Sequence, residues 1–254
     1  MKHLNINEIF YSIQGEGIYV GLPTLFVRFE TCNLDCDYCD TKRAKKKSKS
    51  FKMYDIDGNI YMYSNPISTV DFMSIISNYT YKFLSFTGGE PLICSNHIEE
   101  ILASIQPKDK SIMLETNGTL YESVTKFLLE NIDIWSIDIK LPSVYGNKFN
   151  KDIKDAQEKF FDKMSFAKRV ILKAVFDGST PINELKYSYK KALDIYNINK
   201  NTTLIYQPVT RDKKIKTGKN IKIILKDIIN KNETNETGLE IRIIPQIHKM
   251  LKIM

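Results

Sequence analysis

The chain has 254 residues, of which 43% are hydrophobic and 26% charged, a composition that is ordinary for a globular protein and excludes a disordered one. We expect a single domain over residues 1–254, near the upper size for one core. The start alternates polar and apolar residues without a signal-peptide core, and no stretch approaches the roughly 18 apolar residues of a membrane span. We therefore expect a cytoplasmic protein that does not contact a membrane.

The net charge of +7, from 37 basic and 30 acidic residues, invites a nucleic-acid interpretation. Most lysines are scattered along the chain. The one dense run, residues 42–52, holds seven basic residues in eleven and no aromatic residue before Phe51. We interpret it as a solvated loop in preference to a phosphate-binding patch, and we expect no nucleic acid among the partners.

Three of the four cysteines follow an apolar run, residues 25–29, that predicts a buried strand. Cys32, Cys36 and Cys39 are spaced C-x3-C-x2-C, so three thiolates converge in one short loop. A structural zinc site normally has four ligands, and a [4Fe-4S] cluster with four cysteines has every iron occupied. Three ligands leave one iron open to bind a small molecule and pass it an electron.

Other interpretations of these thiols remain open at this point. His3 or His97 would supply a fourth ligand, but neither has zinc-finger spacing from the three cysteines. A disulfide with an odd thiol, or three unrelated buried cysteines, fits poorly with such clustering in a cysteine-poor chain. Cys94 stands alone and is interpreted as a packed thiol.

Residues 42–65 look like an insertion after the cysteine loop. Asp57-Gly58-Asn59 lies between two apolar runs, which predicts a β-hairpin. Ser68 or Thr69 then caps an amphipathic helix that ends near Asn78.

The remaining chain alternates between short apolar runs and helical patterns, which predicts a parallel sheet with right-handed crossovers. With the strand before the cysteines there are about six or seven parallel strands, too few for a closed eight-stranded barrel. We therefore expect an α/β fold, a partial TIM-like barrel that is open along one side. The predicted strands are residues 82–86, 111–115, 134–139, 169–175, 203–206 and 240–244, and the predicted helices are near residues 96–105, 120–130, 156–164, 182–196 and 220–230.

Polar or glycine-rich residues follow five of these strands, where parallel sheets bind their ligands. Any one segment alone would be an ordinary turn, but five on the same rim indicate a site. Two glycines in Thr87-Gly88-Gly89-Glu90-Pro91 let the backbone approach a ligand, and Glu90 is placed to accept a hydrogen bond from an ammonium group. The five segments are the cysteine loop and residues 87–91, 115–118, 138–140 and 207–210.

The cysteine spacing, with Tyr38 before the last cysteine, resembles the cluster loop of the radical S-adenosylmethionine (SAM) enzymes, and residues 87–91 resemble the element that holds the amino group of SAM there. The resemblance implies a radical SAM core whose cysteines hold a [4Fe-4S] cluster, with SAM chelating the fourth iron. It also implies reductive cleavage of SAM to methionine and a 5'-deoxyadenosyl radical, which abstracts a hydrogen from the substrate. A flavodoxin- or ferredoxin-type protein is the expected electron donor.

Residues 12–17, 21–24 and 26–28, upstream of the cluster loop, form a polar and glycine-rich stretch that cluster binding does not require. Arg28 lies inside the predicted strand, where a guanidinium needs an acidic partner. A substrate carboxylate bound bidentately would serve, and so would an internal ion pair with Glu30 or Glu16.

This stretch and the following cysteine loop are similar to the family of 7-carboxy-7-deazaguanine synthases, radical SAM lyases of queuosine and 7-deazapurine biosynthesis. The similarity covers residues 8–41, 87–91, 115–118 and 245–249. It implies conversion of 6-carboxy-5,6,7,8-tetrahydropterin to 7-carboxy-7-deazaguanine with loss of ammonia, catalytic use of SAM, a magnesium ion and a homodimer.

The resemblance also implies roles for individual residues. The pterin would contact Ile13, Gln14, Gly15, Glu16, Arg28 and Thr87, and Thr41 would ligate magnesium, a hard cation that prefers oxygen. SAM would contact Tyr38, Cys39, Asp40, Gly89, Glu90, Asp138, Ile139, Lys140, Gln207, Pro208, Val209 and Thr210, although Asp138-Ile139-Lys140 is a varied form of the family's strand end.

Two other functions remain as alternatives. A glycyl-radical enzyme activase is also small and uses a C-x3-C-x2-C loop, but it would not need the polar stretch with Arg28. A basic nucleic-acid-binding protein with a structural metal would bind zinc and would bind nucleic acid in a salt-dependent manner through residues 42–52.

Overall fold

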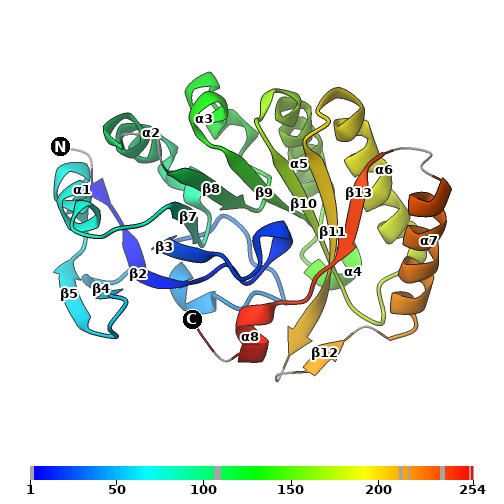
Figure 1. The fold of residues 1–254 in the computed structure, drawn as a ribbon, viewed down its shortest axis with the longest axis horizontal. Helices are drawn as coiled ribbons and strands as arrows, with labels where there is room; N and C mark the ends of the chain where they lie inside the picture. The colour runs from blue at the N-terminus through cyan, green and yellow to red at the C-terminus, as the bar shows by residue number, and fades with distance from the viewer. Residues whose placement is uncertain are drawn as a thin grey trace.

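The computed structural model describes residues 3–105, 110–211, 214–216, 218–234, 238–251 and 253. Its main sheet has 11 strands in the order β12-β11-β10-β9-β8-β7-β3-β2-β4-β5, with β13 paired to β11. The sheet curves without closing, and most of the helices cover its outer side (Figure 1). Within the described residues, the expected open α/β barrel is confirmed.

Seven neighbouring strands make the parallel part of the sheet, at the upper limit of the predicted number. Their observed bounds extend most of the predicted ones by one or two residues, and β11 continues five residues further along the rim. The strands are β3 (Pro23–Phe29), β7 (Phe83–Gly88), β8 (Ser111–Thr116), β9 (Ile134–Ile139), β10 (Val170–Phe176), β11 (Thr202–Arg211) and β13 (Glu240–Ile243).

All six predicted helices are present, two of them with revised boundaries, and two short helices over residues 142–145 and 247–251 were not predicted. The helix predicted over residues 120–130 begins only at Lys126, because the hydroxyl of Thr125 accepts from Leu128 N and caps it there. The helix predicted over residues 156–164 begins earlier, where Asn150 caps it. The helices are α1 (Thr69–Ser77), α2 (Ser95–Ser104), α3 (Lys126–Asn131), α4 (Pro142–Tyr145), α5 (Lys151–Lys163), α6 (Ile182–Ile198), α7 (Asn220–Thr234) and α8 (Ile247–Leu251).

The long strand β2 (Ile6–Ile13) was not predicted, although its polar and apolar residues alternate. It runs antiparallel to β3 and parallel to β4 (Ser50–Tyr54). The predicted hairpin is confirmed: β4 and β5 (Ile60–Ser64) are antiparallel, and they extend the sheet to its edge. Short pairings complete the structure, in β1 (His3–Leu4) with β6 (Ile67–Ser68) and in β12 (Lys214–Lys216) with β11.

Large aromatic side chains fill the space between the sheet and the outer helices. Trp135, Phe86, Phe160 and Phe176 are each less than 2% exposed. Burial of such a side chain stabilises the fold by about 1.5–3 kcal/mol, so this layer holds the strand ends in fixed positions. No helix within the described residues has the length and apolar character needed to cross a bilayer.

Candidate active site

A cavity lies at the carboxyl ends of the parallel strands, and residues from all five predicted rim segments line it. The lining also includes the polar stretch that leads into β3 and the segment that ends in α8. The predicted site residues found there are Ile13, Gln14, Gly15, Glu16, Arg28, Cys32, Cys36, Tyr38, Cys39, Asp40, Thr41, Thr87, Gly89, Asp138, Lys140, Gln207, Val209 and Thr210.

Three predicted SAM contacts do not line this cavity. Ile139 packs in the hydrophobic core, because neighbouring residues of a strand point to opposite faces, and Pro208 is likewise absent from the lining. Glu90 is fully buried, and its carboxylate accepts hydrogen bonds from Thr116 Oγ1 at 2.8 Å and Asn117 N at 2.7 Å. Burial raises the pKa of Glu90 to about 7. Its side chain joins the loops after β7 and β8 and does not line the cavity.

The three clustered cysteines are free thiols at the cavity, so the structure contains no disulfide between them. Cys36 is buried, and the other two are half-buried. Cys39 N donates to Cys36 O at 3.2 Å, which tightens the loop between them. Neither Cys94 nor His97 lines the cavity, and the side chain of His3 lies outside the described part of the chain.

The glycine pair after β7 is required by the cysteine loop itself. A Cβ atom on Gly89 would lie 1.6 Å from the carbonyl oxygen of Thr31, and one on Gly88 would lie 2.4 Å from the backbone of Phe29. The same approach allows hydrogen bonds from Gly89 N to Phe29 O and from Glu90 N to Thr31 O, at 3.1 and 2.9 Å. The sequence had suggested that both glycines admit a ligand, but much of that space belongs to the cysteine loop.

Two buried acceptors on β11 fit a bound cofactor. Gln207 Oε1 and Thr210 Oγ1 have no hydrogen-bond partner among the described residues, although their side chains line the cavity. An unpaired buried polar group costs about 1–3 kcal/mol, so a polar ligand that pairs with them is favoured. Together with three free thiols, these acceptors match the needs of a [4Fe-4S] cluster and SAM.

A chain of buried charges crosses the floor of the cavity. Lys173 Nζ lies 2.6 Å from Glu16 Oε2 and 3.2 Å from Asp138 Oδ1, and Lys140 Nζ lies 3.1 Å from Asp138 Oδ2 and 3.0 Å from Tyr38 OH. Burial by itself would raise the pKa of Glu16, but Lys173 lowers it to about 2. Burial likewise opposes ionisation of Asp138, while Lys140 and Lys173 lower its pKa. These groups therefore remain charged at neutral pH.

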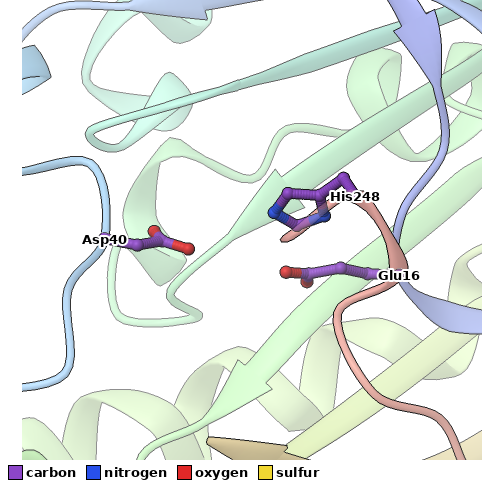
Figure 2. Close-up of side chains that lie close together, drawn as sticks. All are labelled: Glu16, Asp40 and His248. Atoms are coloured by element: carbon purple, nitrogen blue, oxygen red, sulfur yellow. The ribbon is translucent and has the colours of Figure 1, made fainter. Parts of the chain in front are cut away.

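Gln246 and the first turn of α8 add a second polar group to the cavity. Glu16, Asp40 and His248 come from three distant parts of the chain and have potential ligand atoms within 4.8 Å of one another (Figure 2). Gln246 Nε2 donates to Glu16 Oε1 at 2.7 Å and to Asp40 Oδ2 at 3.2 Å, and Lys249 Nζ lies 2.8 Å from Asp40 Oδ2. Both carboxylates are thus already neutralised by ammonium groups.

Two further carboxylates fix the polar stretch around Gln14. Gln14 Nε2 donates to Glu115 Oε1 at 3.2 Å, and Gln14 Oε1 accepts from Glu16 N at 3.1 Å. Arg28 Nε pairs with Glu8 at 2.7 Å, directly across the β2 and β3 ladder. The internal partner of Arg28 is therefore neither Glu30 nor Glu16, because those carboxylates bind Ser48 N and Lys173.

Some cavity residues were missing from the predicted site. Lys173 interrupts the otherwise apolar sequence of β10, VILKAVF, and an isolated charge inside an apolar strand indicates a candidate site residue. Gln246, His248 and Lys249 lie in the stretch 245–249, which the family resemblance covers without implying roles for single residues. Glu115 belonged to a predicted rim segment but had no assigned role.

An open parallel barrel with three free cysteines at its rim defines a radical SAM enzyme. The model of the radical SAM superfamily matches residues 26–194, and the chain belongs to this superfamily. Its cofactors are accordingly a [4Fe-4S] cluster and SAM. Two solved structures share the fold. QueE from Escherichia coli matches with a TM-score of 0.57 and 20% identity, over 97% of this chain and 95% of that one. Streptococcus suis SuiB bound to S-adenosylmethionine matches with a TM-score of 0.55 and 14% identity, over 86% of this chain and 48% of that one.

Similarity to curated proteins identifies the family within the radical SAM superfamily. The chain is 31% identical to the 7-carboxy-7-deazaguanine synthase of Archaeoglobus fulgidus over 98% of both chains. It is 29% identical to that of Geobacter sulfurreducens, over 97% of this chain and 96% of the other. The chain therefore belongs to the family of 7-carboxy-7-deazaguanine synthases.

Proposed function

We propose that this chain converts 6-carboxy-5,6,7,8-tetrahydropterin to 7-carboxy-7-deazaguanine and releases ammonia. The main support is that three free thiols, the unpaired acceptors of β11 and the Glu16 and Lys173 pair line one cavity. The similarity to synthases over nearly the whole chain points to the same reaction. Neither alternative function, an activase or a nucleic-acid-binding protein, has such support.

In this proposal Cys32, Cys36 and Cys39 hold the cluster through thiolates. When bound, the reduced cluster and SAM supply a carbon radical that removes hydrogen from the substrate. The acceptors on Gln207 and Thr210 pair with polar groups of SAM, and the buried ammonium of Lys140 keeps Tyr38 beside the cysteines.

The pterin is proposed to lie against the polar stretch between β2 and β3. Gln14, Glu16 and Thr87 face the cavity and offer hydrogen-bonding groups for the ring. Glu16 is held ionised by Lys173, so it accepts from ring or amino N–H groups. Arg28 uses Nε for Glu8, which leaves its terminal nitrogens for the substrate carboxylate.

Magnesium is proposed to bind Thr41, whose hydroxyl lines the cavity 3.4 Å from Gly88 O. The cluster of Glu16, Asp40 and His248 is a weaker choice, because a cation there would compete with Lys173 and Lys249. We expect Thr41→Ala to weaken the dependence of the rate on magnesium concentration while iron content is unchanged. A magnesium titration equal to that of the wild type would contradict this assignment.

The family assignment requires a reductant and a small-molecule substrate. We propose a flavodoxin- or ferredoxin-type donor and a homodimer. We also propose that the chain folds as a single domain and that the protein is cytoplasmic.

The deciding experiment is anaerobic reconstitution with iron and sulfide, followed by incubation with SAM, dithionite, magnesium and 6-carboxytetrahydropterin. Product is measured by mass spectrometry and deoxyadenosine by chromatography. We expect 7-carboxy-7-deazaguanine to form, with ammonia in equal amount. SAM cleavage without this product would refute the proposed substrate. Cys94→Ala should retain both cluster and product, because Cys94 lies outside the cavity.

A further inference from the structure

A basic surface lies directly on the outside of the cysteine loop. Ala44, which is 1% exposed, donates from its N to Thr41 O at 2.9 Å and accepts from Thr31 N at 2.8 Å. Ser48 N donates to the buried carboxylate of Glu30 at 2.8 Å. The backbone of this run is therefore fastened to both ends of the cysteine loop, while most of its lysine side chains are exposed to solvent, as expected of a solvated loop. Four exposed lysines project from it, and we call them the lysine patch: Lys42, Lys46, Lys47 and Lys49.

The positive charge of the lysine patch is not neutralised by its surroundings. None of its four side chains takes part in an ion pair between described residues. Asp35, an acidic residue of the cysteine loop, is already held by Lys45 at 2.9 Å and by Lys148. Residues 31–52 contain seven basic and three acidic side chains, so the excess positive charge faces solvent.

The position of the lysine patch suits the delivery of an electron. The inference rests on the proposed function, because a radical SAM reaction begins when a cluster held by the three cysteines is reduced. Lys45 lines the same cavity as Cys39, and Lys42 follows that cysteine by three positions. A donor that touches the patch therefore places its redox group beside the cysteine loop.

The chemistry of the patch favours an acidic protein over a nucleic acid. Proteins that bind single-stranded nucleic acids combine basic grooves with exposed aromatic rings for base stacking. The aromatic residue of this run, Phe51, is only 1% exposed and packs against Tyr63. Opposite surface charges, in contrast, increase the rate at which two proteins meet and orient them.

We propose that the lysine patch is the docking surface for a small acidic protein that carries a low-potential electron. One electron leaves the reduced donor and enters the cluster, and no covalent bond forms or breaks in the docking step. The patch acts by holding the donor, so its lysines are positioning residues and not catalytic ones.

The binding test uses a purified flavodoxin as the probe and compares two variants of equal charge. In the first, Lys42, Lys46, Lys47 and Lys49 are all replaced by Gln. In the second, Gln replaces four exposed lysines of α6 and α7, which lie at the other end of the sheet from the hairpin (Figure 1): Lys186, Lys190, Lys222 and Lys226.

Titration calorimetry with oxidised flavodoxin and cluster-loaded protein, without SAM or a reductant, measures docking without any reaction. We expect the patch variant to bind about tenfold more weakly at low salt and to lose most of the salt dependence, because charge pairs drive the encounter. The control variant should bind as the wild type does. Equal weakening in both variants, or no weakening in the patch variant, would overturn the proposal.

A kinetic test separates this inference from the proposed function. SAM cleavage driven by reduced flavodoxin should be several-fold slower in the patch variant, while cleavage driven by dithionite should be unchanged. Because SAM cleavage is the readout, the result stands even if the pterin is not the substrate. Arg at the four patch positions should restore the flavodoxin rate; equal losses with both reductants would mean that the patch supports the fold or the cluster.

Discussion

At the scale of single residues, close backbone approaches decide whether the site forms. Gly89 lets the carbonyl of Thr31 come close, and Gly15 leaves room for His248, whose Nδ1 would lie 2.1 Å from a Cβ at that position. The first approach positions the cysteine loop, and the second positions α8 through His248. Any larger residue at either position must displace the partner.

Gly89→Ala is expected to lose most of its iron after reconstitution, because the new methyl group would overlap backbone atoms that have no room to move. Iron and sulfide content per chain is the measurement. Gly58→Ala is the matched control: its Cβ would meet nothing within 4 Å, so it should cost only about 1–2 kcal/mol of backbone strain at its positive φ. Full iron content in Gly89→Ala would contradict the steric argument.

Arg28 combines a structural and a proposed binding role, and two variants separate them. Glu8→Gln breaks the ion pair but keeps the guanidinium, whereas Arg28→Gln removes both. If Arg28 binds the substrate carboxylate, only Arg28→Gln should raise KM for the pterin by about 10- to 100-fold, the range of a charged hydrogen bond of about 1.5–3 kcal/mol. Equal KM values in both variants would assign Arg28 to the ion pair alone. SAM binding and iron content should be unaffected in either.

At the scale of elements, the segment from β13 to α8 closes one side of the cavity. Ile247 N donates to Gly15 O at 2.9 Å, which ties this late segment to the end of β2. Gln246 is 8% exposed and bridges two carboxylates from opposite walls. The element therefore sets the spacing between the polar stretch and the cysteine loop.

Gln246→Ala should raise KM for the pterin by about tenfold, because the carboxylates of Glu16 and Asp40 lose the donor that bridges them and fixes their spacing. Steady-state kinetics with reconstituted protein provides the measurement. Met250→Ala, at a 52% exposed position of the same helix, should behave as the wild type. An unchanged KM in Gln246→Ala would mean that the bridge does not affect substrate binding.

At the scale of the whole molecule, buried charges tie the two ends of the chain to its middle. Glu16 near the start contacts Lys173 of β10 and Gln246 near the end. Its pKa, about 2 in the folded chain, lies below its ordinary value of 4.5. The unfolded chain therefore binds the extra proton first, and the stability from Glu16 is present above pH 4.5 and lost as the pH falls toward 2.

The advantage of the wild type over Glu16→Gln in unfolding free energy should therefore shrink by about 1.5 kcal/mol between pH 4.5 and pH 3. Urea unfolding of cluster-free protein at several pH values measures it. Glu130→Gln, at an exposed site on α3, is the control and should follow the wild type. A constant difference between wild type and Glu16→Gln across this range would show that Lys173 does not hold Glu16 ionised.

The sequence by itself determined the features that depend on local spacing. The cysteine triplet, the glycine pair and the alternation of strands and helices are patterns of neighbouring residues, so the open barrel and most of its lining followed from them. Parallel strands bring their carboxyl ends to one rim, so the order of strands and helices in the sequence already places five separate segments together.

The tertiary structure alone decided which side chains face one another. The side chain of Glu90 is buried because the loop after β8 provides two hydrogen-bond donors for its carboxylate. Arg28 pairs with Glu8 because the two residues are opposite each other in the β2 and β3 ladder. Lys173 and Glu16 are 157 positions apart, and their contact depends on how the sheet curves. Local patterns do not encode such pairings, because strand register and sheet curvature are set by packing of the whole chain.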